Sequence, residues 1–157
     1  MARKNIAELI RFAIIAALIV IPFRFFVAQP FLVSGDSMFP TFSNNDYLIV
    51  DELSYRFREP ERGEVVVFRS PVENSKYLIK RITGVPGETV RFSLPADAAP
   101  IASLATEIAL AADEYFVQGD NRAASFDSRY WGALPRENIK GRAFLRLWPI
   151  SKIEFLP

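Results

Sequence analysis

The sequence predicts a mostly β domain preceded by one apolar helix, and three observations support this fold class. Beyond residue 30, short runs rich in β-branched and aromatic residues alternate with turn signals, as in antiparallel sheets. Residues 9–28 form an almost uninterrupted apolar stretch. Half of the 157 residues are hydrophobic, and the mean hydropathy of +0.13 is high for a wholly soluble protein. A chain of this length forms one compact domain with an accessory segment.

The apolar stretch predicts a membrane anchor over residues 9–28, where Arg11 and Arg24 are the charged residues. Twenty helical residues cover roughly 30 Å, enough to cross the hydrocarbon core if both guanidinium groups extend to its surfaces. A cleavable signal peptide is the first alternative, but Arg24 and Phe26 stand where small cleavage-site residues belong. A buried globular helix is the second alternative.

The charge distribution predicts the orientation of this anchor. Three basic residues precede the uncharged run, whereas residues 25–55 contain no Lys or Arg. By the positive-inside rule, residues 1–8 are a cytoplasmic tail and residues 29–157 lie outside the cell membrane.

The rest of the chain predicts short strands at residues 46–51, 64–68, 77–82, 88–92, 114–118 and 142–148. Asn44–Asn45, Arg62–Gly63 and Pro86–Gly87 mark turns between them. Residues 96–112 are rich in alanine and predict either a short helix or a loop.

The composition excludes several kinds of function. The chain has no histidine and no cysteine, so a Ser-His-Asp triad is impossible and a zinc site would need carboxylates alone. The net charge of +1, without a basic stripe, gives no case for nucleic acid. We expect neither a metal nor another cofactor.

Ser37 is the candidate nucleophile, within the segment Ser34–Thr41 (SGDSMFPT). Without an imidazole, its base must be something else, and a lysine with a lowered pKa is the remaining candidate. The alternative is that Ser37 only caps a turn shaped by Gly35 and Pro40.

Lys80 is the candidate base. Strand alternation over residues 77–82 (YLIKRI) places Leu78, Lys80 and Ile82 on one face. An ammonium among aliphatic side chains is desolvated, which lowers its pKa. Acting near pH 8 requires a drop of two or more units from ~10.4, about 3 kcal/mol. The alternative is a solvated charge on an edge strand.

Residues 119–132 (GDNRAASFDSRYWG) predict a hydrogen-bonded loop braced by carboxylate–guanidinium pairs. A hydroxyl from this loop could hold the lysine amine in place. A purely structural loop is the alternative.

Together these segments, with Asn45–Val50 (NDYLIV) and Arg62–Gly87, match one family in order and wording. The chain resembles a type I (leader) signal peptidase of the bacterial kind, a Ser/Lys-dyad serine protease. The resemblance covers almost the whole chain apart from residues 88–113, a short segment where some members carry a large inserted subdomain. It implies a coiled, barrel-like β peptidase domain over residues 29–157. It also implies a membrane-bound endopeptidase that removes signal peptides from exported preproteins, cutting after small residues of the Ala-x-Ala type through an acyl-enzyme.

The resemblance assigns roles residue by residue. Ser37 matches the nucleophile, Lys80 the general base, and Ser125 the serine that orients this lysine. The backbone N–H of Ser37 matches an oxyanion donor, whereas Gly35 stands where some members have a serine, which leaves the second donor open. A structural ion pair and the walls of shallow substrate pockets are also implied, by Asp127 and Arg129 and by Val33, Phe42, Leu78 and Ile79 respectively.

The implied partners are preprotein signal peptides and the lipid bilayer. Because few residues separate the anchor from Ser37, we expect Phe31, Leu32, Phe39 and Phe42 to form an apolar surface that dips into lipid. Alternatives within the family are a mitochondrial inner-membrane peptidase and, more distantly, the self-cleaving repressors of the DNA-damage response. A non-catalytic, membrane-anchored module that binds signal peptides is the alternative from another class.

Overall fold

The computed structural model describes residues 2–26, 28–93 and 105–156. The longest helix, α1, covers Ala2–Phe26, and a short helix, α2, covers Ser128–Trp131. The strands are β1 (Ala28–Leu32), β2 (Tyr47–Asp51), β3 (Val65–Arg69), β4 (Tyr77–Gly84), β5 (Thr89–Ser93), β6 (Ala105–Ala109), β7 (Glu114–Gln118), β8 (Leu134–Pro135), β9 (Ile139–Trp148) and β10 (Glu154–Phe155). Four 3-10 turns complete the described elements: η1 (Ser54–Arg56), η2 (Arg122–Ala124), η3 (Arg136–Asn138) and η4 (Ile150–Lys152).

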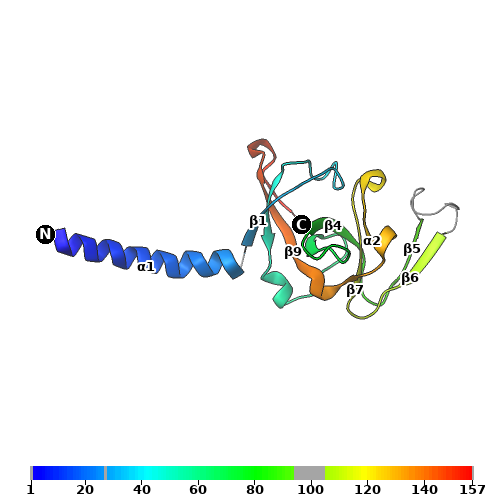
Figure 1. Ribbon diagram of the computed structural model, residues 1–157, viewed down its shortest axis with the longest axis horizontal. Coiled ribbons are helices and arrows are strands. Elements are labelled where there is room, and N and C mark those ends of the chain that lie inside the picture. The colour runs from blue at the N-terminus through cyan, green and yellow to red at the C-terminus, as the bar shows by residue number, and fades with distance from the viewer. Residues whose placement is uncertain (1, 27, 94–104, 157) are drawn as a thin grey trace.

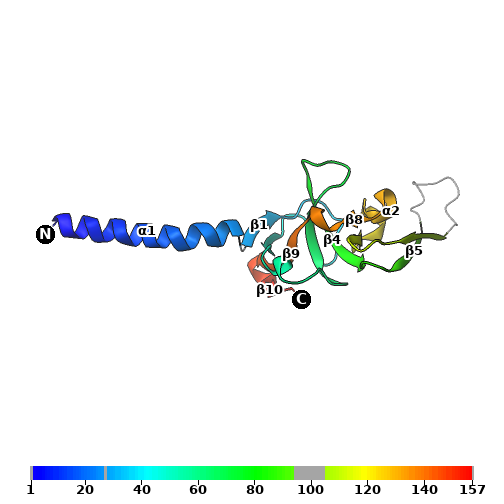
Figure 2. The ribbon, with the colours of Figure 1, turned by 90° about the horizontal axis from the view of Figure 1, so that it is seen from below.

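The strands form an antiparallel sheet in the order β1-β2-β9-β3-β4-β7-β8, with β10 paired to β9. The strand β9 runs through the middle of the domain and curves (Figure 1), with register shifts against both β2 and β3. Such shifts bend a strand and increase its twist. One hydrophobic cluster lies around Phe68 and Tyr115, and a second lies around Met38, Phe42 and Leu48. The hairpin β5–β6 projects at the end opposite to α1 (Figures 1 and 2).

The predicted mostly β, antiparallel fold class is confirmed, and every predicted strand overlaps an observed one. Two five-residue strands were not predicted, and neither were the two-residue strands β8 and β10. The first, β1, follows the apolar segment directly, and the second, β6, lies within the alanine-rich stretch 96–112. Residues 96–104 of that stretch lie outside the described residues. For residues 105–109, the expectation of a helix or loop is wrong, because they pair with β5.

The expected anchor over residues 9–28 differs from the observed helix. The helix begins earlier and ends at Phe26, and Ala28 already belongs to β1. Leu9, Phe12 and Leu18 on α1 have exposed side chains. Over residues 2–26, 28–93 and 105–156, no helix has both the length and the apolar character needed to cross a membrane.

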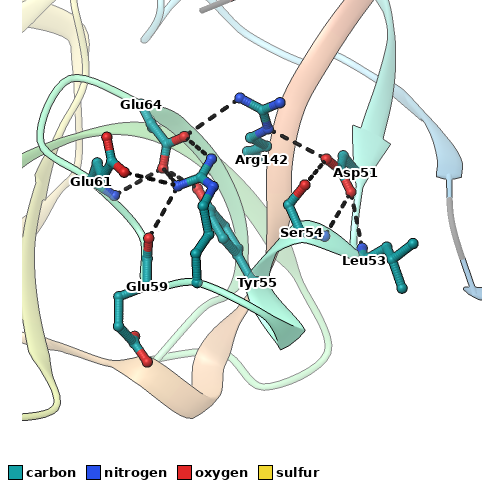
Figure 3. Close-up of polar contacts among 9 residues, drawn as sticks. Asp51, Leu53, Ser54, Tyr55, Glu59, Glu61, Glu64 and Arg142 are labelled. Carbon is teal, nitrogen blue, oxygen red and sulfur yellow. Dashed lines mark hydrogen bonds and ion pairs between the residues drawn. The ribbon is translucent and has the colours of Figure 1, made fainter.

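A buried carboxylate, Glu64, ties β3 to its neighbours. Its side chain accepts a hydrogen bond from the Tyr55 hydroxyl at 2.8 Å and pairs with Arg58, and Arg142 of β9 lies 3.6 Å away (Figure 3). Burial alone would raise the pKa of Glu64, but these cationic and hydrogen-bonding partners lower it. Arg142 also contacts Asp51 at 3.4 Å. The buried charge is therefore paired, as stability requires.

Candidate active site

Ser37 lies in the connection between β1 and β2, in a turn whose shape depends on neighbouring residues. Gly35 has φ +88°, a conformation that glycine adopts without strain, and its N–H donates to Asn44 Oδ1 at 2.9 Å. Directly after Ser37, Met38 is fully buried, and its carbonyl accepts from the Phe42 N–H at 2.9 Å. The turn is thus fixed on both sides of Ser37.

Lys80 lies on β4 between β3 and β7, and it is 3% exposed. Its Nζ donates a hydrogen bond to Ser37 Oγ at 2.6 Å. Burial lowers the pKa of Lys80 to about 8, although the negative charges of Asp127 and Asp120 act in the opposite direction. The alternative of a solvated edge charge is therefore wrong. The structure brings the expected nucleophile and the expected base into contact.

Ser125 is buried close to Ser37, but its hydroxyl makes no hydrogen bond within the described part of the chain. Gly119 packs directly against it, since a Cβ at Gly119 would overlap both Ser125 Oγ and the Ser37 carbonyl oxygen. The structure therefore places Ser125 at the site without showing the expected bond to Lys80.

The loop that carries Ser125 is braced by Asp127. This fully buried carboxylate lies 2.8 Å from Arg129 Nε and accepts the Gly119 N–H at 3.0 Å. Burial would raise the pKa of Asp127, but hydrogen bonds from Arg129 and Gly119 lower it. Asp127 and Arg129 thus form the ion pair that the resemblance implied.

Two further residues of this loop, Asn121 and Asp120, join it to the Ser37 turn, and their roles were not predicted. The Asn121 N–H donates to the Ser37 carbonyl at 3.0 Å, and its side chain donates to the Asp36 carbonyl at 3.1 Å. Asp120 accepts from the Thr41 hydroxyl at 2.5 Å and pairs with Arg81 at 2.7 Å. All of these residues lie within the quoted motifs, but sequence does not say which of them meet.

A cavity of about 360 Å³ opens beside Ser37 and Lys80. Three of the four residues expected in the substrate pockets line it, namely Val33, Leu78 and Ile79. Phe42 lies outside the lining. It is fully buried in the core, with the Arg146 guanidinium 5.0 Å from its ring centre, so it forms no surface of this cavity and cannot dip into lipid. No group of three or more acidic residues within the described residues could hold a metal ion.

Comparison with known proteins gives a consistent result. The family model described as "Signal peptidase, peptidase S26" matches residues 6–99 and 96–148. The chain is 41% identical to a "Probable signal peptidase I-2" from Synechocystis sp., over 95% of this chain and 76% of that protein. It is 37% identical to a "Signal peptidase I" from Leptolyngbya laminosa, over 83% of this chain and 73% of that one. It is 33% identical to "Mitochondrial inner membrane protease subunit 1" from Mus musculus, over 83% of this chain and 76% of that protein.

Proposed function

The chain belongs to the signal peptidase family, peptidase S26, and on that premise we propose that it is a serine endopeptidase that removes signal peptides from exported preproteins. The observation that carries the proposed mechanism is the 2.6 Å contact between the buried amine of Lys80 and Ser37 Oγ. A Ser/Lys dyad needs this proximity, together with an environment that favours the neutral amine.

In this mechanism, neutral Lys80 takes the proton of Ser37 as Oγ attacks the scissile carbonyl carbon. The tetrahedral intermediate collapses when the C–N bond breaks and Lys80 returns the proton to the leaving amine. Water then attacks the ester on Ser37 with Lys80 again as base, which releases the carboxylic acid and restores the hydroxyl. Ser125 orients the amine, and the Ser37 N–H stabilises the oxyanion.

The substrate lies as an extended strand between two free strand edges. Within the described residues, β1 pairs with β2 alone, and β7 pairs with β4 from Arg81 onward, which leaves the outer edge of residues 77–80 open. The cavity between residues 31–37 and 76–80 follows these edges. A peptide that adds a strand there gains main-chain hydrogen bonds, and its alternate side chains enter pockets. The lining by Val33, Leu78 and Ile79 suits small apolar side chains.

Membrane placement is part of the proposal. The side chains of Leu9, Phe12 and Leu18 on α1, and of Leu32 and Phe39 near Ser37, are large, apolar and exposed. A lipid bilayer covers such surfaces favourably. The amino terminus then lies on the cytoplasmic side, and the residues after 28 lie outside, where exported preproteins emerge.

A cleavage assay tests the catalytic proposal. Detergent-solubilised protein is incubated with a preprotein that has alanine at the first and third positions before the cut. We expect Ser37→Ala to reduce cleavage by ~10³-fold or more. Ser43→Ala, the same chemical change in the same connection, keeps it. Binding of the preprotein without cleavage by the unaltered protein would favour the non-catalytic module instead.

A further inference from the structure

A second cavity lies next to the catalytic one, and Tyr77 lines both of them. It has a volume of about 410 Å³, and polar residues form most of its wall: Arg69, Asn74, Tyr77, Glu137, Asn138, Ile139 and Lys140. Neither the dyad nor the expected pocket residues contribute to it. The mechanism above therefore leaves this cavity without a role.

The register of β3 and β4 shows how the two cavities are related. Val67 lies opposite Ile79, and both line the catalytic cavity. The neighbouring pair on the same face is Arg69 opposite Tyr77, and both line the second cavity. The two cavities are therefore consecutive along one face of the sheet.

An aromatic pair marks the boundary between the cavities. The ring of Phe31, from β1, packs edge-on against the ring of Tyr77 with 5.7 Å between centroids. Edge-to-face pairs of this kind hold a defined geometry. Tyr77 on β4 is thus supported by Phe31 on β1, and both residues line the catalytic cavity.

The spacing along β4 relates this boundary to the bond that is cut. Tyr77 lies three positions before Lys80 on β4, about 10 Å away at ~3.3 Å per residue. The residues that would accept small side chains before the cut, Val33, Leu78 and Ile79, lie between the dyad and this boundary. A substrate strand therefore reaches Tyr77 about three to four residues upstream of the cut, and its next residues meet the second cavity.

The charges in the second cavity indicate which side chains it accepts. Arg69 is exposed and forms no ion pair with any described residue. Lys140 is paired with Glu52 at 2.9 Å, and Asn138 donates to the Arg69 carbonyl at 3.0 Å, which fixes this wall. Glu137 is also exposed and forms no ion pair with a described residue, but Arg69 lies directly opposite Tyr77, at the boundary that the substrate meets first. The guanidinium at this boundary favours an acidic or hydrogen-bond-accepting side chain over a cationic one.

We propose that the second cavity is a substrate subsite, bounded by Tyr77, that takes the residues about four to six positions before the cut and prefers acidic over basic side chains there. This proposal rests on the proposed signal peptidase function.

Paired peptide substrates test the proposal, identical except for Glu or Lys at the fifth position before the cut. Assays use the full chain at low ionic strength in a neutral detergent without anionic lipid, so that no lipid headgroup occupies the cavity. We expect a Glu-to-Lys ratio of kcat/KM of about 3 to 10 for the unaltered protein, falling with added salt. Arg69→Gln brings this ratio close to one, and Arg69→Glu inverts it.

Two controls give the result its meaning. Arg91→Gln removes an exposed guanidinium that lines neither cavity and leaves the ratio unchanged. Tyr77→Phe keeps the aromatic boundary and the position of the preference, whereas Tyr77→Ala spreads the preference to neighbouring positions. An equal ratio for both peptides, or a ratio that Arg69→Glu leaves unchanged, overturns the subsite.

A binding measurement separates this inference from the function on which it rests. The Ser37→Ala variant is titrated with both peptides, labelled for fluorescence anisotropy. If the Glu peptide binds more tightly and Arg69→Glu reverses this preference, the subsite is supported even when the unaltered protein cleaves neither peptide. Absence of cleavage would refute only the peptidase function. Cleavage of both peptides at equal rates, with equal binding, refutes the subsite and leaves the peptidase standing.

Discussion

Lys80 is buried next to Ser37, and its burial has opposite effects on stability and on catalysis. Burial removes water from the ammonium, which lowers its pKa to about 8 from an ordinary value of 10.5. This difference corresponds to on the order of 3 kcal/mol against the charged form. The same desolvation supplies a neutral amine at a pH where a solvated lysine would be charged.

The first prediction concerns the pH dependence of cleavage. Because the base must be neutral, we expect kcat/KM to rise with pH through about 8 and then level off. A pH–rate profile from pH 6 to 10 measures this. Lys80→Arg places a permanently charged group at the same position and should abolish cleavage across the range. A profile that is flat between pH 6 and 9 would show that Lys80 is not the base.

The second prediction concerns stability. The pKa of Lys80 is lower in the folded than in the unfolded protein, so the unfolded state binds more protons between pH 8 and 10.5. The burial penalty is therefore fully present below pH 8 and disappears as pH rises toward 10.5. We expect Lys80→Met to increase the free energy of unfolding at pH 7, by up to about 3 kcal/mol. Urea unfolding at pH 7 and pH 10 measures the difference, which should be smaller at pH 10. An equal difference at both values would contradict this account.

The third prediction concerns Ser125. We expect Ser125→Ala to lower kcat roughly 10- to 100-fold, which is part of the ~10²- to 10⁴-fold rate enhancement that a positioned base contributes. The variant should also displace the pH–rate profile. Ser128→Ala is the contrasting variant, since Ser128 Oγ accepts the Val117 N–H at 3.0 Å and is structural. It should weaken folding without displacing the profile. Full activity in Ser125→Ala would remove this hydroxyl from the mechanism.

At the scale of elements, the site depends on how closely the 119–129 loop approaches the Ser37 turn. Gly119 allows that approach, because any side chain there would overlap Ser125 and the carbonyl of Ser37. Asn121 then bonds to the same turn. The dyad geometry is therefore set by a loop far away in the sequence.

The fourth prediction follows from this packing. Gly119→Ala should displace the Ser37 turn and lower kcat strongly, with a loss of stability of about 1–3 kcal/mol from overpacking. Gly84→Ala is a matched control, because a Cβ there would also overlap its neighbours, Val90 and Phe116, away from the dyad. It should lose comparable stability while the folded fraction keeps its kcat. If both variants cleave at the same rate per folded molecule, Gly119 has no specific role at the site.

The sequence was informative where periodicity or a motif was local. Alternation placed Lys80 correctly on a buried strand face. Strand β1 was missed because it continues an apolar run whose composition suited a helix, and β6 because alanine gives no strand signal. Phe42 was expected in a pocket because the resemblance placed it there, yet it is buried in the core, where the guanidinium of Arg146, far along the chain, lies over its ring. Contacts such as Asp120 with Arg81 and Thr41 are long-range, and no spacing in one sequence encodes them.

At the scale of the whole molecule, α1 is separate from the core of the β domain. Within the described residues, both hydrophobic clusters begin at Val33 or later, and α1 extends away from the sheet (Figures 1 and 2). The cavity beside the dyad starts at Phe31, only a few residues after α1 ends. The helix can therefore fix the position of the site without stabilising it.

The fifth prediction is that removal of residues 1–27 leaves the β domain folded, with a Tm within a few degrees of the full chain, because no core cluster loses a member. Cleavage of a detergent-solubilised preprotein should persist, whereas sedimentation with lipid vesicles should fall sharply. Any remaining lipid association should depend on Leu32 and Phe39, which are 57% and 54% exposed. Leu32→Asp and Phe39→Asp in the shortened chain should remove it, with the exposed Val72→Asp as control. Unchanged sedimentation after loss of α1 and both side chains would show that neither surface meets the bilayer.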